Sequence, residues 1–239
     1  MPKFPTMTDT RQLALEWPHR PALTRADFVV GAANEAAMAM IDGFPHWPNR
    51  VAVLVGPPGS GKTHLASIWR EASGAREIAA HDLSGVDLGE LLATGAVLVE
   101  GIDAENVSPT ALFHLLNLVR EREGYALLTS RIAPAELPFP LADLQSRLRA
   151  AVPVVLEAPD DALLAQVVVK LFADRQLPVD AGLIDYLSRR MERSLDAANR
   201  LVAALDAAAL AAGRPVTRQL AAQVLAREDV DDTWDGEDL

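Results

Sequence analysis

The chain has 239 residues, half of them hydrophobic, a formal net charge of −11 and no cysteine. This length allows one large domain or one domain with a smaller companion, and the lack of cysteine excludes disulfides and thiol chemistry and favours a cytoplasmic location. The acidic balance argues against a protein that holds DNA by itself, because neutralising phosphates needs a basic face, and no apolar stretch is long enough to span a bilayer.

Residues 1–22 have no periodic apolar pattern, which predicts a flexible tail. This tail nevertheless contains the peptide Gln12-Leu13-Ala14-Leu15-Glu16-Trp17. Leucine and tryptophan in an otherwise polar tail have no core to fill, so we interpret the peptide as a docking segment. Polar contacts at the mouth of a partner's pocket would come from Gln12. The apolar subsites would be filled by Leu13, Leu15 and Trp17.

A phosphate-binding loop follows the apolar run 51–55, which predicts a buried strand. The loop reads Gly56-Pro57-Pro58-Gly59-Ser60-Gly61-Lys62-Thr63 and leads into a helix predicted over 62–72. The glycines let backbone N–H groups turn toward phosphate oxygens, and the helix start adds the positive end of its dipole. Lys62 would neutralise the β and γ phosphates, and Thr63 would place its hydroxyl on Mg²⁺. We therefore predict that the chain binds ADP or ATP together with Mg²⁺.

The next strong strand ends in residues that are unusual for an ATPase. Residues 96–99 form a continuous apolar run, followed by Glu100-Gly101-Ile102-Asp103. Hydrolysis of ATP needs an acid at the end of a neighbouring strand for Mg²⁺ and usually a second acid that aligns the attacking water. Glu100 stands at the metal position, but Gly101 stands where the second acid is expected, and Asp103 lies in a predicted loop. This pattern favours a nucleotide-binding switch with little turnover over a competent ATPase.

The other elements before residue 158 alternate between helix and strand. We predict helices over 34–42, 87–93, 108–123 and 142–149, and strands over 76–80, 125–129 and 152–156. Such alternation produces βαβ units, so the fold class is α/β with a mainly parallel sheet and helices on both faces.

Pro159 marks a boundary, because the pattern beyond it is helical. We predict four helices over 160–175, 179–191, 194–213 and 217–227. Residues 23–158 would then form an αβα nucleotide-binding domain, and residues 159–227 a small all-α domain. The segment 228–239 has seven acidic residues and no basic one, which predicts a solvated, disordered tail.

The order of these parts over residues 23–227 resembles the AAA+ ATPases, and more narrowly the family of the bacterial replication initiator DnaA. Phe28-Val29-Val30 resembles the segment that lies against the adenine in that family. Residues 127–131 resemble the strand and loop of the γ-phosphate sensor, and residues 144–148 resemble the box that holds the arginine finger. The resemblance implies an AAA+ P-loop domain with a helical lid. It also implies that Arg147, or alternatively Arg149, acts on the nucleotide of a neighbouring subunit.

Three departures from the family affect these expectations. Arg131 replaces the acidic residue that follows the sensor strand, which leaves Thr129 or Ser130 as the polar contact. The start of the third lid helix lacks the second sensor arginine, although Arg193 and Arg200 flank that place. The sequence after the lid is an acidic segment rather than a DNA-reading domain, so we expect no sequence-specific binding of DNA.

Within this family the combination resembles the regulatory inactivators of DnaA. The peptide 12–17 is similar to those that attach bacterial replication proteins to the β sliding clamp of DNA polymerase III. The resemblance implies an ADP-bound protein that docks on the clamp and stimulates hydrolysis of DnaA-bound ATP, which prevents over-initiation of replication. A homodimer is compatible with the sequence. The alternative is an autonomous AAA+ ATPase, a loader or remodelling motor in replication, in which Glu100 and Asp103 together support catalysis.

Overall fold

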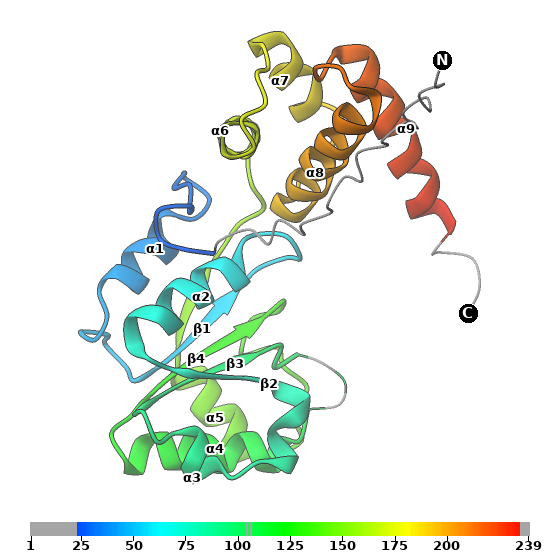
Figure 1. The fold of residues 1–239 in the computed structure, drawn as a ribbon. Helices are drawn as coiled ribbons and strands as arrows, with labels where there is room; N and C mark the ends of the chain where they lie inside the picture. Colours follow the sequence, from blue (N-terminus) through cyan, green and yellow to red (C-terminus); the bar gives the residue numbers. More distant parts are fainter. Residues whose placement is uncertain (1–22, 104, 106, 235–239) are drawn as a thin grey trace, which may run out of the picture.

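The computed structural model describes residues 23–103, 105 and 107–234 (Figure 1). Its larger part is built on a five-stranded sheet whose strands run in the order β2-β3-β4-β1-β5. All the neighbouring pairs are parallel. The strands are β1 (Val51–Val55), β2 (Arg76–Ala79), β3 (Ala96–Glu100), β4 (Tyr125–Ser130) and β5 (Val152–Val155). Because the strands are parallel, the segments that follow β1, β3 and β4 leave the sheet at the same edge.

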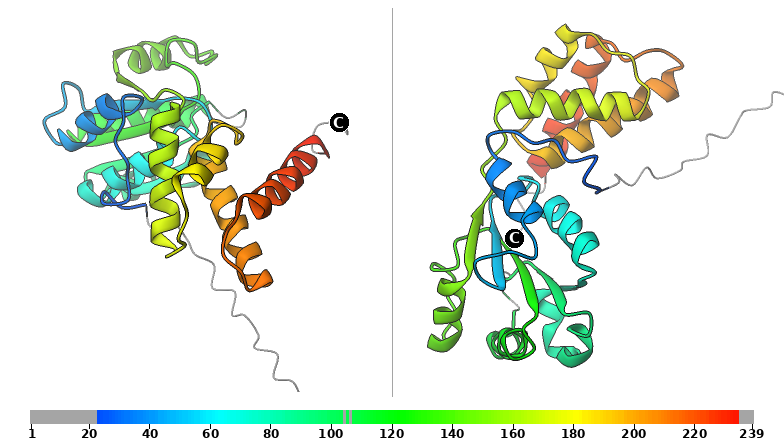
Figure 2. Two further views of the ribbon diagram at one scale, coloured as in Figure 1. Left: turned by 90° about the horizontal axis from the view of Figure 1, so that it is seen from above. Right: turned by 90° about the vertical axis from the view of Figure 1, so that its left-hand side faces the viewer.

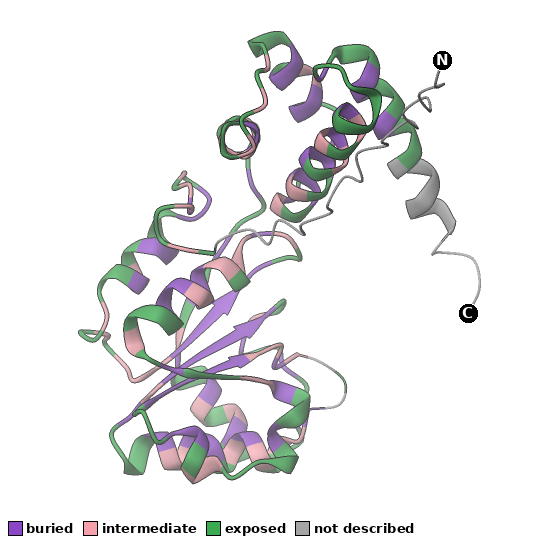
Figure 3. Cartoon of the chain, viewed as in Figure 1, coloured by how far each residue is buried: buried purple, intermediate pink, exposed green. Residues whose placement is uncertain are grey.

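Helices cover both faces of this sheet. The helices α1 (Glu35–Asp42) and α2 (Lys62–Ser73) lie on one face, where Leu65 and Trp69 pack with Leu54. The helices α3 (Leu88–Leu91), α4 (Pro109–Glu121) and α5 (Ala142–Ala150) and the 3₁₀ helix η1 (Ala80–Gly85) lie on the other. Figure 3 shows the strands buried between the two helical layers. Alternate residues of β1, β3 and β4 therefore enter different cores, and the predicted α/β fold class is confirmed.

Four helices form the second part, the lid, which lies beyond the carboxyl ends of the strands (Figures 1 and 2). They are α6 (Asp161–Asp174), α7 (Ala181–Ser188), α8 (Leu195–Ala212) and α9 (Arg218–Trp234). Their apolar faces meet in a separate core that includes Phe172, Leu187 and Leu201. None of the helices in the described ranges is long and apolar enough to cross a membrane.

Side-chain caps fix where the lid helices begin. The carboxylates of Asp160 and Asp180 and the hydroxyl of Ser194 accept hydrogen bonds from the first-turn N–H groups of α6, α7 and α8. Such caps satisfy donors that have no partner inside the helix. The end of α9 differs from the prediction, because the helix continues to Trp234. Residues 228–234 are therefore helical, and the expectation of a disordered tail from residue 228 is wrong for this segment.

Candidate nucleotide-binding site

The loop between β1 and α2 has the backbone of a phosphate cradle that only glycine can form. Gly59 and Gly61 have φ values of +67° and +96°, in the left-handed region that favours glycine. A Cβ atom at Gly56 would lie 2.5 Å from the carbonyl oxygen of Leu156, and one at Gly59 would overlap the hydroxyl of Ser194. The loop is thus packed so closely against the residue that follows β5 and against the N-cap of α8 that side chains at Gly56 and Gly59 are excluded.

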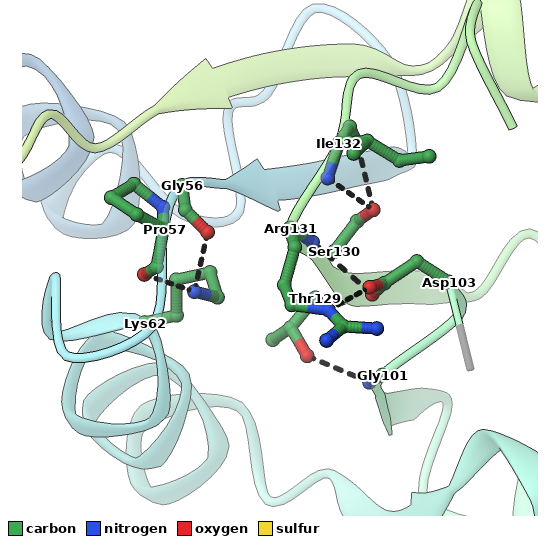
Figure 4. A network of polar contacts seen from close by, with 9 residues as sticks. All are labelled: Gly56, Pro57, Lys62, Gly101, Asp103, Thr129, Ser130, Arg131 and Ile132. Atoms are coloured by element: carbon green, nitrogen blue, oxygen red, sulfur yellow. Dashed lines mark hydrogen bonds and ion pairs between the residues drawn. The ribbon is translucent and has the colours of Figure 1, made fainter. Parts of the chain in front are cut away.

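Lys62, the first residue of α2, turns its side chain back over this loop (Figure 4). Its Nζ donates hydrogen bonds to the carbonyl oxygens of Gly56 at 2.6 Å and Pro57 at 2.7 Å. Burial lowers the pKa of Lys62, and the carboxylates of Asp103 and Asp196 oppose this shift. The ammonium group therefore sits where phosphate oxygens could replace the two carbonyl groups as its partners.

Glu100 and Thr63 supply oxygen atoms beside the loop. Glu100 ends β3, and its buried Oε1 has no hydrogen-bond partner among the described residues. Burial raises the pKa of Glu100, the nearby Glu77 adds to the shift, and the hydroxyl of Thr63 opposes it. An unpartnered carboxylate oxygen beside a hydroxyl fits the oxygen ligands that Mg²⁺ prefers. The described residues contain no group of three or more His, Cys, Asp and Glu side chains suited to a metal ion, so Mg²⁺ would need phosphates as further ligands.

The raised pKa of Glu100 predicts how its replacement changes stability. A carboxyl group with a raised pKa in the folded state contributes stability that is complete below its ordinary value of 4.5 and is lost as the pH rises through the folded pKa. We therefore expect nucleotide-free Glu100→Gln to unfold at a higher temperature than the wild type at about pH 8, with the difference vanishing at about pH 4. Thermal unfolding without Mg²⁺ checks this, with the surface variant Glu121→Gln as control. A lower unfolding temperature for Glu100→Gln at the higher pH would contradict the assignment.

The ends of β3 and β4 are joined by polar contacts. The backbone N–H of Gly101 donates to Thr129 Oγ1 at 2.9 Å, and the Ser130 hydroxyl donates to the carbonyl oxygen of Ile132 at 2.7 Å. The hydroxyl hydrogen of Ser130 is thus bonded within the loop that follows β4. Of the two candidates for the polar sensor contact, Thr129 is the one whose hydroxyl lies between the two strand ends.

Asp103 and Arg131 form an ion pair at the same edge of the sheet (Figure 4). The Arg131 backbone N–H donates to Asp103 Oδ1 at 3.1 Å, and the Arg131 Nε donates to Oδ2. The Asp103 side chain is 6% exposed, whereas that of Arg131 is 61% exposed. Burial would raise the pKa of Asp103, but the hydrogen bonds from Arg131 outweigh it and the pKa is lowered. The carboxylate is therefore charged and held on both oxygens.

The segment expected beside the adenine lies next to the phosphate loop. The buried Phe28 ring meets the His64 ring edge-on, with their centroids 5.1 Å apart, and a Cβ atom placed at Gly61 would lie 3.7 Å from this ring. Asn34 fixes this segment, because it accepts from the Gly31 N–H at 2.9 Å and donates to the Val29 carbonyl at 3.0 Å. Val30 is 43% exposed. Of the three residues 28–30, Phe28 thus packs inward beside the loop, and Val30 is open to solvent.

The lid touches the phosphate loop through the start of α8. The Leu195 N–H donates to the Gly59 carbonyl at 2.8 Å, and the carboxylate of Asp196 influences Lys62 electrostatically. The two arginines considered as second sensors are engaged elsewhere, Arg193 with Asp161 and Arg200 with Glu192. The lid residues at the loop are therefore Ser194, Leu195 and Asp196, which sequence reasoning did not select.

Arg147 lies far from this loop, toward the amino ends of the strands. It belongs to α5, which ends just before β5 begins, and it lines a cavity of about 680 Å³ together with Arg50 and Val51 at the start of β1. Its guanidinium carbon is 5.3 Å from the centre of the Phe113 ring. Arg149, the alternative finger, is exposed. Since β1 separates this cavity from the phosphate loop, Arg147 does not reach the loop of its own chain. The docking peptide 12–17 lies outside the described residues.

No protein-family model and no curated protein matches this sequence, but solved structures resemble its fold. Domain III of the Thermotoga maritima replication initiation protein DnaA matches with a TM-score of 0.73 and 18% identity over 87% of this chain and 97% of that one. AMPPCP-bound DnaA from Aquifex aeolicus matches with a TM-score of 0.63 and 19% identity, over 77% of this chain and 65% of that one. The Thermotoga maritima RuvB Holliday junction branch migration motor matches with a TM-score of 0.63 and 14% identity over 82% of this chain and 69% of that one. At these identities the similarity establishes a shared fold.

Proposed function

Since the chain has the AAA+ P-loop fold, we propose that it is a nucleotide-binding regulator of replication initiation that acts as the regulatory inactivator of DnaA (Hda) does. In this proposal the chain binds ADP with Mg²⁺, docks on the β sliding clamp through residues 12–17, and presents Arg147 to ATP bound by DnaA. Hydrolysis then takes place on the initiator, and further initiation is prevented.

The observation that carries the proposal is the separation of the loop from Arg147. A phosphate loop with a lysine and an unpartnered carboxylate lies at the carboxyl ends of the strands. Arg147 lines a cavity near the amino ends of the strands. An arginine that stabilises the charge on a transferring phosphoryl group must reach that group. Arg147 cannot do so within its own chain, which favours a role on the nucleotide of a partner.

The Asp103–Arg131 pair also favours action on a partner. Gly101 offers no side chain that could orient water, and the oxygens of Asp103 are held by Arg131. A protein that assists hydrolysis elsewhere does not need its own water-aligning acid. Bound nucleotide would instead set the orientation of the lid, because α8 contacts the loop directly through Leu195 and Gly59.

One observation supports the alternative of an autonomous ATPase acting as a loader or motor. Asp103 lies close enough to the loop to influence Lys62, so a change in its contacts could supply the missing acid. Intrinsic turnover distinguishes the two functions. The regulator hydrolyses ATP slowly alone and accelerates hydrolysis by DnaA in the presence of DNA-loaded clamp, whereas the motor turns over ATP at several per second, within the usual range of enzymes, without a partner.

The docking peptide gives a separate prediction. We expect the double variant Leu13→Ala/Leu15→Ala to lose binding to the β clamp, because both apolar subsites would be left unfilled, while its nucleotide affinity is unchanged. Surface plasmon resonance with immobilised clamp measures this. Glu16→Gln is the matched control, since that side chain alternates with the leucines along an extended peptide and should leave binding intact. Equal clamp affinity of the double variant and the wild type would remove the docking assignment.

A further inference from the structure

We propose that Asp103 is a latent general base of the nucleotide site and that Arg131 restrains it. Removal of the arginine side chain then activates hydrolysis of ATP within this chain. The inference rests on the proposed binding of nucleotide and goes beyond the proposed action on a partner, because it concerns an activity of this chain's own site.

The first support is the course of the backbone after β3. Gly101 has a φ of +71°, and a Cβ atom placed there would meet no described atom within 4 Å. The position that would carry a water-aligning acid is therefore open and without a side chain. The left-handed turn redirects the chain, and the N–H of Ile102 donates to the Thr129 carbonyl at 3.0 Å. Asp103 consequently returns to the end of β4, beside the residues that follow the sensor strand.

The second support is electrostatic. Among the charged groups that influence Lys62, Asp103 has the largest effect, ahead of Asp196, Arg131 and Glu100. The ammonium of Lys62 marks the place of the phosphates, so a carboxylate that raises the pKa of Lys62 against burial lies near that place. Glu100 has a different role from Asp103, because it lies beside Thr63 at the position expected for the metal.

The third support is the way in which Asp103 is held. Arg131 donates to both carboxylate oxygens, one bond coming from its backbone N–H and one from its Nε. The backbone bond persists in any variant, whereas the guanidinium bond and the positive charge depend on the side chain. A carboxylate engaged by a guanidinium is a weaker base, and one of its oxygens is blocked from a water molecule. Because the Arg131 side chain is mostly exposed, its removal opens no cavity in the core.

Once the Arg131 side chain no longer holds Asp103, the reaction is ordinary hydrolysis of ATP. The oxygen of a water molecule forms a bond to the γ phosphorus, and the bond from that phosphorus to the β–γ bridging oxygen breaks. Asp103 accepts a proton from the water and later returns it to solvent, and the products are ADP and inorganic phosphate. No oxidant, reductant or further reactant is needed.

The test compares Arg131→Gln, Asp103→Asn and the double variant with the wild type, in the full chain without partners. We expect Arg131→Gln to raise intrinsic ATP turnover by about tenfold or more, which is a part of the roughly 10²–10⁴-fold that a well-placed general base contributes, and the double variant to return to the wild-type rate. Arg25→Gln is the control, because Arg25 forms an exposed pair with Asp42 at 3.1 Å, and should leave turnover unchanged. Unchanged or reduced turnover in Arg131→Gln would overturn the proposal.

A second readout does not depend on hydrolysis. Unfolding of the four nucleotide-free proteins gives a double-mutant cycle, in which the Asp103 and Arg131 effects should be non-additive if the pair exists. Additive effects would refute the restraint. Arg131→Lys, which keeps the charge but loses the Nε donor, should show intermediate turnover if Arg131→Gln folds poorly. Titration with ATP and ADP separates this inference from the proposed function. If the wild type binds neither nucleotide, the proposed function is refuted. The double-mutant cycle then tests only whether Arg131 restrains Asp103.

Discussion

The Lys62→Ala variant is expected to bind ATP and ADP about 10- to 100-fold more weakly than the wild type. Hydrogen bonds to charged groups contribute about 1.5–3 kcal/mol, and each 1.4 kcal/mol corresponds to about a tenfold change in affinity. Lys62 Nζ already lies at the loop, bonded to the carbonyl oxygens of Gly56 and Pro57. On nucleotide binding, phosphate oxygens would replace those carbonyl oxygens, and alanine removes the only lysine ammonium in the loop motif.

Titration with a fluorescent nucleotide measures the loss, and Arg76→Ala serves as a control that removes an exposed positive charge from β2. The variant should remain folded, because burial already disfavours the charged form of Lys62, so deleting the ammonium costs the nucleotide-free protein little. An affinity for both nucleotides within about threefold of the wild type would mean that the loop does not hold phosphates in the manner of the motif.

The parts of the fold that could be predicted are those fixed by local chemistry. The apolar runs 51–55 and 96–99 were predictable as strands because a strand covered by helices on both faces needs consecutive apolar side chains. Ser108, Asp160 and Ser194 cap the helices that follow them, since their oxygens satisfy first-turn N–H groups. The glycine loop between β1 and α2 was recognisable for the same reason, because its spacing encodes its own backbone conformation.

The parts that could not be predicted depend on contacts between distant segments. Asp103 and Arg131 are separated by 28 positions and meet only because β3 and β4 are neighbours in the sheet, which sequence periodicity does not specify. The contact between Leu195 and Gly59 depends on how the lid is placed on the base. The end of α9 was misjudged because the acidic composition of residues 228–234 indicates solvation, while the helix continues through them to Trp234.

Loss of the Arg147 side chain is expected to have the largest functional effect. We expect Arg147→Ala to reduce the stimulated hydrolysis of DnaA-bound ATP by about a thousandfold or more, the range found when an arginine finger is absent. Its nucleotide affinity and clamp affinity should match the wild type, because the residue lies at the end of β1 opposite the phosphate loop. Folding should be little affected, since a cation–π contact such as that with Phe113 contributes about 0.5–1 kcal/mol at an exposed site.

The measurement is release of phosphate from DnaA–ATP in the presence of DNA-loaded clamp and ADP, with Arg149→Ala as the matched control. Arg149 lies two positions away on the same helix and is exposed, so its loss changes the net charge equally while leaving the cavity intact. Full stimulation by Arg147→Ala together with loss in Arg149→Ala would move the finger to Arg149. If both variants stimulate as well as the wild type, α5 does not supply the finger, and the action on a partner's nucleotide must involve another surface of the chain.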